Sequence, residues 1–365
     1  MNHGRPSGHT RVIVVDDSRL MRRMIVAGLE TDPDITVVAE AADTVEARRL
    51  IRELDPDVIT LDVEMPGMNG IDFLKKIMEL RPMPVVMVST LTASGTDVTL
   101  SALEIGAVEA IAKPAGRDAV ARFSQALREK VRLAHGSKVH PSGAAARKSV
   151  VPRARPAPMQ RRPGPARRRR VDLIALGAST GGVNALTQVL EGLPAGTPPI
   201  LVTQHMPALF AERFASRLNA ILPHDVAIGG EEEILRPGQI RIAPGENHLA
   251  LYRDGAVFRT RLDPSGPISG HKPSVDVLFN SVSTSVGGNA LGVILTGMGR
   301  DGAAGLRAMR KAGAYCIGQN ENSCVVYGMP RAARDLDAVD EELALGQIPL
   351  RICEILNPQG VSTLA

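Results

Sequence analysis

The chain has 365 residues, a length typical of two domains. Apolar residues make up 44% of it, but aromatic residues only 2% and Trp is absent, so a core must be built from aliphatic side chains, which favours buried parallel strands covered by helices. The net charge of +4 is concentrated in one segment: residues 136–170 hold eleven Lys and Arg and no Asp or Glu, which leaves about −7 for the rest and argues against specific nucleic-acid binding by the whole protein.

Cysteine usage and hydropathy indicate the cellular compartment of the protein. Cys316, Cys324 and Cys353 form no C-x-x-C pair and are expected to be free thiols in a reducing compartment. No apolar run approaches the roughly 18–20 residues that span a bilayer, and the N-terminal MNHGRPSGHTR has no apolar stretch that could act as an export signal. The sequence therefore predicts a cytoplasmic protein without membrane insertion.

Residues 11–133 alternate strand and helix patterns five times. Amphipathic stretches such as SRLMRRMIVAGLE and TVEARRLIREL separate strand-like runs that begin at Arg11, Ile35, Asp57, Pro84 and Val108. Such an alternation predicts a (βα)5 domain, in which an open parallel sheet carries helices on both faces.

Five polar residues follow or end the predicted strands of this domain: Asp16, Asp17, Asp62, Ser89 and Lys113. Ligands of a doubly wound sheet bind at the carboxyl ends of the strands, so we expect these side chains to converge. Three neighbouring carboxylates repel one another unless a hard cation such as Mg²⁺ lies between them. A carboxylate can accept a phosphoryl group, with Mg²⁺ and an ammonium group neutralising the moving charge. If only one such residue were present, an ordinary loop acid or a surface lysine would be the simpler explanation. Five of them at appropriate strand ends favour a functional site.

The pattern closely resembles the receiver domains of response regulators, which are flavodoxin-like. This resemblance implies that Asp62 is the phospho-acceptor. It also implies that Mg²⁺ is held by Asp16, Asp17 and Asp62 together with the backbone carbonyl of Glu64.

The same resemblance assigns Ser89 and Lys113 to binding of the added phosphoryl group, which a chemotaxis histidine kinase would donate. Many receivers carry an aromatic residue three positions before this lysine. Here that position is Ala110, so the resemblance does not extend to switching by an aromatic side chain.

Residues 134–170 differ in composition from both neighbouring regions. They contain Pro, Gly, Ala and Arg but almost no large apolar residues, so they cannot bury enough surface to offset the entropy of ordering. We predict a flexible linker. The run RRRR at 167–170 could contact an acidic partner, although a solvated, self-repelling tether is the favoured interpretation.

Residues 171–358 form a second predicted α/β domain. Its strand signals are VDLIALG, PPILVTQ, QIRIAP, HLALYRD, ALGVILTG and AYCIGQ, and its helix signals include VNALTQVLEGL, LFAERFASRLNAIL, SVDVLFNSVSTSV and AAGLRAMRKAG. The order predicts a doubly wound, mostly parallel sheet. The section 225–263 is richer in strand signals, which suggests inserted hairpins.

The first strand of this domain runs into the turn GASTGG, which has two interpretations. A dinucleotide-binding loop requires G-x-G-x-x-G and an acid about 20 residues later, but the middle glycine is Ser179 and the second strand ends in Gln204 and His205. A nucleophile turn fits better, because a serine ahead of a helix N-terminus faces backbone N–H groups that can stabilise an oxyanion. The turn shares the logic of the nucleophile elbow but not its G-x-S-x-G pattern.

A nucleophilic serine requires a base and an orienting acid. His205 ends the second strand, and Asp301 follows the apolar strand ALGVIL within TGMGRDG, so both are expected at the same sheet edge as Ser179. His248 and His271 are alternative bases, or residues that line the substrate cleft. The spacing of these histidines does not favour a zinc site.

Longer motifs of this domain are GASTGG, TQHMP, IAPG, HKPSVDVLF, GVILTGMGRDGAAGLRAMR and SCVVYGMP. Together they look like the catalytic domain of the chemotaxis protein-glutamate methylesterases over residues 171–355, while the receiver resemblance covers 11–130. The resemblance implies a catalytic triad of Ser179, His205 and Asp301, with Thr180 and the backbone near Met298 stabilising the oxyanion.

What the resemblance implies about activity is specific. The protein would be a phosphorylation-activated serine hydrolase that needs no cofactor for its ester chemistry. It would release methanol from glutamate methyl esters on methyl-accepting chemoreceptors and deamidate receptor glutamines. Two alternatives remain open: a non-enzymatic response regulator whose basic segment binds nucleic acid or a partner, and a serine hydrolase acting on another ester.

Overall fold

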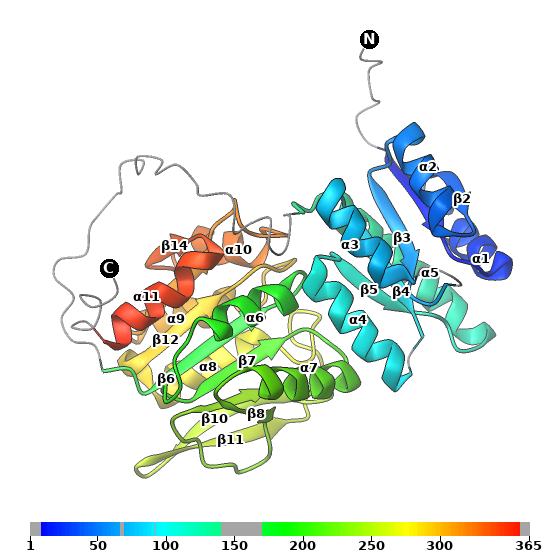
Figure 1. Ribbon diagram of the computed structural model, residues 1–365. Coiled ribbons are helices and arrows are strands. Elements are labelled where there is room, and N and C mark those ends of the chain that lie inside the picture. Colours follow the sequence, from blue (N-terminus) through cyan, green and yellow to red (C-terminus); the bar gives the residue numbers. More distant parts are fainter. Residues whose placement is uncertain (1–8, 66–68, 91, 140–169, 358–365) are drawn as a thin grey trace, which may run out of the picture. The chain divides into compact units, whose positions relative to one another are not determined.

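The computed structural model describes residues 9–65, 69–90, 92–139 and 170–357 (Figure 1). The chain divides between Ala146 and Arg147 into two compact units, each described by itself below. Most of the predicted linker, residues 140–169, lies outside the described residues. Within the described ranges, no helix is both long and apolar enough to cross a membrane.

The first unit is built on a five-stranded parallel sheet with the order β2-β1-β3-β4-β5. Its strands are β1 (Thr10–Val15), β2 (Ile35–Ala41), β3 (Val58–Asp62), β4 (Val85–Ser89) and β5 (Glu109–Ala112). Every residue of β3 and β4 is buried, as expected for central strands of a sheet covered on both faces. The strand order is that of a flavodoxin-like sheet, so the predicted (βα)5 fold is confirmed.

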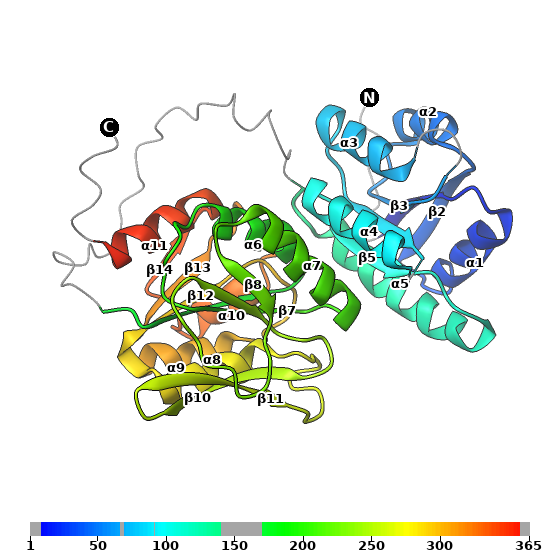
Figure 2. The ribbon, with the colours of Figure 1, turned by 60° about the horizontal axis from the view of Figure 1, so that its bottom comes forward.

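Helices cover both faces of this sheet: α1 and α5 lie on one side and α2, α3 and α4 on the other (Figure 2). Their bounds are α1 (Arg19–Leu29), α2 (Thr44–Leu54), α3 (Gly70–Leu80), α4 (Ala93–Ile105) and α5 (Val120–His135), with the short η1 (Arg117–Ala119) before α5. Each of the helices α1 to α4 begins after a short polar residue whose side chain accepts a hydrogen bond from a backbone amide of the first turn. These N-cap residues are Ser18, Asp43, Asn69 and Thr92.

The second unit is built on a seven-stranded sheet with the order β14-β13-β12-β6-β7-β9-β8, in which neighbouring strands pair in parallel. The strands are β6 (Leu173–Ala178), β7 (Ile200–Gln204), β8 (Asp225–Ile228), β9 (Gln239–Ile242), β12 (Ala290–Ile294), β13 (Tyr315–Gln319) and β14 (Glu341–Leu343). The chain grows from β6 first toward β8 and later, through β12, toward β14. The strand order therefore reverses beside β6, and the predicted doubly wound sheet is confirmed.

Helices α6 (Gly182–Glu191), α7 (Ala208–Ile221) and α11 (Ile348–Leu356) lie on one face of this sheet, and α8 (Val275–Ser285) and α9 (Ala303–Lys311) on the other (Figure 2). The remaining elements are α10 (Met329–Asp335), η2 (Gly287–Asn289) and η3 (Leu345–Gln347). The sequence patterns did not reveal α10, α11 or β14. The strand is only three residues long, and both helices carry a proline in the first turn, which hides the start of an apolar period.

The strand-rich section confirms one predicted hairpin and corrects the rest. Strands β10 (His248–Asp254) and β11 (Val257–Asp263) form an antiparallel pair beside α8. Strands β8 and β9 instead pair in parallel and extend the main sheet, so the expectation of hairpins was wrong for them. The nearly buried Arg241 of β9 explains this arrangement, because it forms ion pairs with Asp225 of β8 at 2.8 Å and with Glu233 in the connection at 2.7 Å.

Candidate active site

The first unit gathers its acidic residues at the carboxyl ends of its strands. Asp16 and Asp17 follow β1, and Asp62 is the last residue of β3; ligand oxygens of all three lie within 4.8 Å of one another. Lys113 follows β5 and places its Nζ 2.8 Å from Asp62 Oδ2 and 3.1 Å from Asp16 Oδ2. The predicted convergence of these four residues is therefore present in the fold.

Charge in this cluster is poorly balanced. Burial raises the pKa of Asp62 to about 6, and the neighbouring Asp16 acts in the same direction, while Lys113 and the Glu64 amide oppose them. Asp16 Oδ2 is buried and accepts no hydrogen bond from the described residues, although Lys113 lies beside it. A buried, under-satisfied carboxylate oxygen within a cluster of acids fits a hard cation such as Mg²⁺.

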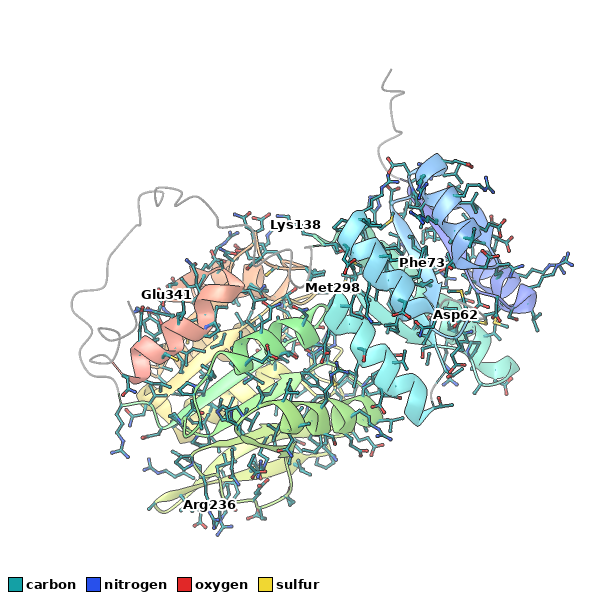
Figure 3. All side chains as sticks on the ribbon, in the orientation of Figure 1. Asp62, Phe73, Lys138, Arg236, Met298 and Glu341 are labelled. Atoms are coloured by element: carbon teal, nitrogen blue, oxygen red, sulfur yellow. The ribbon has the colours of Figure 1, made fainter. Side chains whose placement is uncertain are left out.

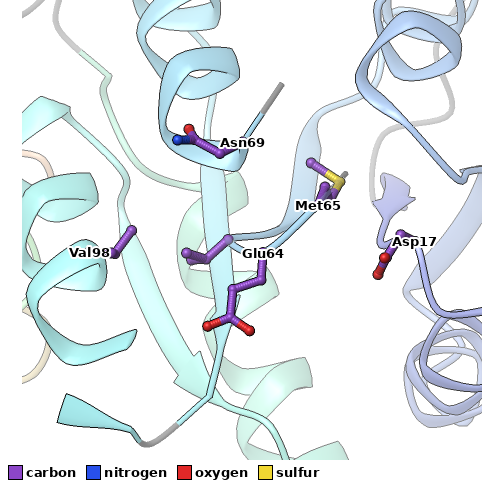
Figure 4. A pocket seen from close by; sticks show the side chains of 6 residues that line it. Asp17, Glu64, Met65, Asn69 and Val98 are labelled. Carbon is purple, nitrogen blue, oxygen red and sulfur yellow. The ribbon is translucent and has the colours of Figure 1, made fainter. Parts of the chain in front are cut away.

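An open cavity of about 480 Å³ adjoins the acidic cluster. Figure 4 shows Asp17, Glu64, Met65, Asn69 and Val98 around it. The Glu64 amide donates to Asp62 Oδ1 at 3.2 Å, which holds the loop after β3 close to the predicted phospho-acceptor. The cavity thus leaves room for a small group beside Asp17 and the loop that follows Asp62.

Two further residues singled out in the sequence of this unit are Ser89 and Ala110. Ser89 ends β4 at the same sheet edge, and its hydroxyl lies 3.3 Å from the carbonyl oxygens of both Thr90 and Gly95. Ala110 lies in β5 and packs against the hydrophobic core of the first unit. The backbone carbonyl of Glu64 as a metal ligand remains a prediction.

The nucleophile turn of the second unit links β6 to α6. Ser179 follows β6, its amide donates to the Thr296 carbonyl at 3.0 Å, and its own carbonyl accepts the Gly182 amide at 2.7 Å. Gly181 has φ = 75°, and a Cβ there would lie 2.6 Å from a methyl group of Val325. Only glycine fits this tight turn, which holds Ser179 at the carboxyl edge of the sheet.

His205 follows β7 and connects the serine to the acid. Its Nδ1 lies 3.1 Å from Ser179 Oγ, and its Nε2 lies 2.8 Å from Asp301 Oδ2. With an ionised Asp301, Nε2 carries the proton and Nδ1 is free to accept one from the serine hydroxyl. Three residues that are distant in sequence thereby form one hydrogen-bonded chain, and its geometry suits the predicted roles of nucleophile, base and orienting acid.

Asp301 is buried at the N-terminus of α8. Its carboxylate accepts hydrogen bonds from Ser274 Oγ at 2.8 Å, the Val275 amide at 2.7 Å and the Asp276 amide at 3.1 Å. Burial opposes ionisation, but the hydrogen bonds from His205, Ser274 and Val275 outweigh it and lower the pKa of Asp301. The acid is therefore ionised at neutral pH, as orientation of His205 requires.

Ser274 lies at the start of α8, where a serine side chain commonly caps a helix. It occupies the N-cap position, but its side chain forms no capping hydrogen bond. Its hydroxyl donates to Asp301 instead, and the Asp301 carboxylate accepts the first amides of the helix. A carboxylate from a distant loop cannot be recognised as a cap from local sequence.

The two competing histidines occupy different environments. His248 is fully buried; its Nδ1 accepts the Ser274 amide at 2.9 Å, and its Nε2 lies 3.1 Å from the Gly266 carbonyl. Both of its nitrogens face these structural partners. The His271 ring instead stacks on the ring of His205, with the centroids 3.9 Å apart and an interplanar angle of 9°.

Gln204 is a residue of the site that the sequence patterns did not single out. It is buried, and its Nε2 lies 2.9 Å from the Ser179 carbonyl oxygen and 3.3 Å from that of His205. One amide group thus joins the backbones of the predicted nucleophile and base. Its position directly before His205 was the only available signal.

The residues predicted to support the oxyanion lie beside the serine. Thr180 is buried, and its carbonyl accepts the Thr296 hydroxyl at 3.0 Å. A Cβ added to Gly297 would lie 2.7 Å from Ser179 Cβ, so the loop that carries Met298 runs directly against the nucleophile. Met298 is 55% exposed. Its side chain is labelled in Figure 3.

Comparisons with known proteins identify families for both units. Residues 12–123 match the family model of the response regulator receiver domain, and residues 174–352 match that of the CheB methylesterase. A Caulobacter vibrioides protein named protein-glutamate methylesterase/protein-glutamine glutaminase 1 is 50% identical over 95% of this chain and 98% of its own length. A protein-glutamate methylesterase/protein-glutamine glutaminase of Agrobacterium fabrum is 50% identical over 96% of this chain and 97% of its own length.

Among solved structures, the crystal structure of the Thermotoga maritima CheB methylesterase catalytic domain is similar to the second unit. It has 32% sequence identity and a TM-score of 0.50, and the match covers 51% of this chain and 98% of that domain. The chain therefore belongs to the protein-glutamate methylesterase/protein-glutamine glutaminase family and carries a response regulator receiver domain ahead of its methylesterase domain.

Proposed function

We propose that this protein hydrolyses glutamate methyl esters on methyl-accepting chemoreceptors, releasing methanol, and converts certain receptor glutamines to glutamate. The observation that carries the proposal is the hydrogen-bonded chain from Ser179 Oγ through His205 to Asp301, with distances of 3.1 and 2.8 Å. We further propose that residues 11–133 act as the receiver, 134–170 as a flexible linker and 171–358 as the catalytic domain.

In the first half of the reaction, Ser179 Oγ attacks the ester carbonyl carbon while His205 Nδ1 takes the serine proton. The tetrahedral intermediate then collapses, the bond to the methoxy oxygen breaks, and His205 returns its proton to the departing methanol. Asp301 keeps the other ring nitrogen protonated and stabilises the transient imidazolium.

In the second half, water attacks the acyl group on Ser179 and gives its proton to His205 Nδ1. That proton passes to Ser179 Oγ as the bond to the acyl carbon breaks and the glutamic acid side chain leaves, which restores the enzyme. The released acid then gives the second proton of the water to solvent and becomes the carboxylate. Deamidation follows the same path with ammonia in place of methanol. The backbone amides near Thr180 and Met298 are the proposed donors to the oxyanion, because both loops run against Ser179.

Phosphorylation at Asp62 is the proposed activating signal, with a chemotaxis histidine kinase as donor. Asp16, Asp17 and Asp62, with the Glu64 carbonyl, would hold Mg²⁺, which neutralises charge on the transferred phosphoryl group. Lys113 Nζ, 2.8 Å from Asp62 Oδ2, would pair with the added phosphate, and Ser89 would donate its hydroxyl to it. The cytoplasm is the proposed site of action, because a reducing compartment suits three cysteines that form no disulfide bond among the described residues.

A methanol-release assay on methylated receptor membranes tests the proposal. The wild-type chain should release methanol, and Ser179→Ala should reduce turnover by roughly three or more orders of magnitude without loss of folding. Thr187→Ala is a matched control, because Thr187 lies on α6 and its hydroxyl donates to the Val183 carbonyl of the same helix, its one hydrogen-bond partner among the described residues. Near-normal methanol release by Ser179→Ala would contradict the assignment.

A further inference from the structure

The loop between β11 and α8 presents a second imidazole to the proposed base. His271 lies over His205 with ring centroids 3.9 Å apart and planes inclined by 9°, so the two rings are stacked face to face. The loop is held in place by hydrogen bonds of 3.0 Å that His271 and Ile268 exchange through their backbones. Lys272 Nζ also donates to the Pro264 carbonyl at 2.8 Å. The stack is thus supported by its own loop.

The stack and the triad use different parts of the His205 ring. Both ring nitrogens of His205 make hydrogen bonds, Nδ1 with Ser179 Oγ and Nε2 with Asp301 Oδ2. His271 covers the ring face, so it does not compete with the serine for the proton-accepting nitrogen. It limits tilting of the His205 ring out of the plane that joins nucleophile and acid.

The charges around His271 keep it neutral. Burial lowers the pKa of His271, and a positive charge on His205 lowers it further, while Asp301 acts in the opposite direction. The ammonium of the neighbouring Lys272 is directed to the Pro264 carbonyl. At neutral pH a neutral ring therefore faces His205, which becomes cationic during the reaction.

We propose that His271 is a positioning residue whose neutral ring stabilises the imidazolium form of His205 and holds its plane during acyl transfer. The π-face of a neutral aromatic ring attracts a cation placed above it, and the attraction is larger where water is excluded. Because the charge on His205 appears only as the serine is deprotonated, this contact favours the transition state over the ground state. The inference rests on the proposed function of the triad.

Three substitutions of His271 separate the effect of its aromatic ring from the effects of its polarity, size and titrating group. His271→Phe keeps an aromatic face without a titrating group, His271→Gln keeps polarity and size without a ring, and His271→Ala removes both. We expect the full-length Phe variant to retain kcat for methanol release within about threefold, and the Gln and Ala variants to lose about tenfold, with KM changed less than kcat.

The pH profile provides a readout that a purely structural role would not move. Once His271 is protonated it repels a cationic His205, so activity of the wild type requires both rings to be neutral before the reaction. Toward low pH the logarithm of its rate should steepen from a slope of about one to about two. The Phe variant should keep a slope of about one throughout, because its stack contains no second imidazole.

A second measurement is independent of the receptor substrate: the rate at which a fluorophosphonate label reacts with Ser179. Labelling depends on activation of the serine by His205, so it should fall in the Gln and Ala variants and persist in Phe. Wild-type labelling without methanol release would reject the proposed substrate and leave the stack testable. Equal labelling and turnover in Ala and wild type, equal loss in Phe and Ala, or a wild-type rate in Gln would overturn the proposal.

Discussion

Asp301 shows how much a single residue can do in this fold. Its carboxylate accepts hydrogen bonds from the first amides of α8 and from Nε2–H of His205. The positive end of a helix dipole and three hydrogen bonds from the start of α8 stabilise the charged form. Because the folded pKa is lowered, Asp301 contributes stability above its ordinary pKa, and that stability is lost as the pH falls through the folded value.

Ser274 should matter to catalysis although it does not face the nucleophile. In Ser274→Ala the Asp301 carboxylate loses one buried hydrogen bond of 2.8 Å and gains freedom to turn away from His205. We expect destabilisation by about 1.5–3 kcal/mol and a kcat lower by about tenfold. Thermal unfolding and methanol release measure the two effects.

Ser283 on the same helix provides the matched control. Its hydroxyl makes an exposed hydrogen bond to the Asn280 carbonyl and to no other group among the described residues, so Ser283→Ala should leave both stability and kcat close to wild type. Equal behaviour of the two serine variants would show that the Ser274–Asp301 hydrogen bond has no catalytic role.

Asp62 has the opposite electrostatic character, since its folded pKa of about 6 lies above the ordinary value of 3.8. The folded state then loses stability as the pH rises from the ordinary value through the folded value. In metal-free protein, Asp62→Asn should raise the stability of the first unit at pH 7 by on the order of 2–3 kcal/mol. The gain should shrink toward pH 4, and calorimetry with and without chelator measures it; a loss of stability at pH 7 would contradict it.

At the scale of elements, the ends of β6 and β7 have to keep a fixed distance. Gln204 joins them, because its amide nitrogen contacts the carbonyl oxygens of Ser179 and His205 at 2.9 and 3.3 Å. A Cβ on Gly182 would lie 2.0 Å from Gln204 Oε1, so the glycine of the turn allows this close approach. Strand pairing alone does not set the position of residues beyond the last strand hydrogen bond.

Gln204→Leu should therefore impair geometry more than folding. We expect kcat to fall by up to about a hundredfold with little change in KM, because displacement of the base or nucleophile by a fraction of an ångström misaligns proton transfer. Thr203→Val is the matched control on the same strand, since the buried Thr203 hydroxyl has no hydrogen-bond partner among the described residues. If Gln204→Leu and Thr203→Val are equally active, the proposed link between the two strand ends is wrong.

The order of the elements also explains why the site is where it is. The strand order of the second sheet reverses beside β6, and the residues that follow β6, β7 and β12 meet at that point. In the first unit the residues that follow β1, β3 and β5 meet in the same way. Both candidate sites thus follow from a common rule for open parallel sheets.

At the scale of the whole molecule, the proposed receiver and catalytic domain act as one regulated enzyme. With Mg²⁺ and acetyl phosphate, methanol release by the full chain should rise about fivefold or more. Asp62→Asn, or removal of Mg²⁺ by chelator, should make the rate insensitive to acetyl phosphate, because the phospho-acceptor or its cation is missing.

Asp72→Asn serves as the control for that experiment. Asp72 is an exposed acid on α3 whose ion pair with Lys75 lies on the helix surface, so this variant should keep the full response. A response that survives in Asp62→Asn would refute Asp62 as the phospho-acceptor, whereas a wild-type chain that hydrolyses the ester but never responds would refute regulation alone.

Much of this protein was predictable because its information is local and periodic. Alternating apolar strands and amphipathic helices predicted both parallel sheets, and polar residues just after the strands pointed to Asp16, Asp62, Ser179, His205 and Asp301. These residues could be named without coordinates, because the carboxyl ends of parallel strands share one edge. Motif resemblance then indicated the family, and the relatives along nearly the whole chain agree.

The contacts that complete the site were decided by tertiary structure. The stack of His271 on His205, the capping of α8 by Asp301 and the link from Gln204 to Ser179 join residues that are 66, 26 and 25 positions apart in sequence. Their geometry depends on how loops close between strands, and no local period encodes that. The sequence by itself determined which side chains reach the sheet edge; only the packing of the loops determined which ring nitrogen meets which oxygen.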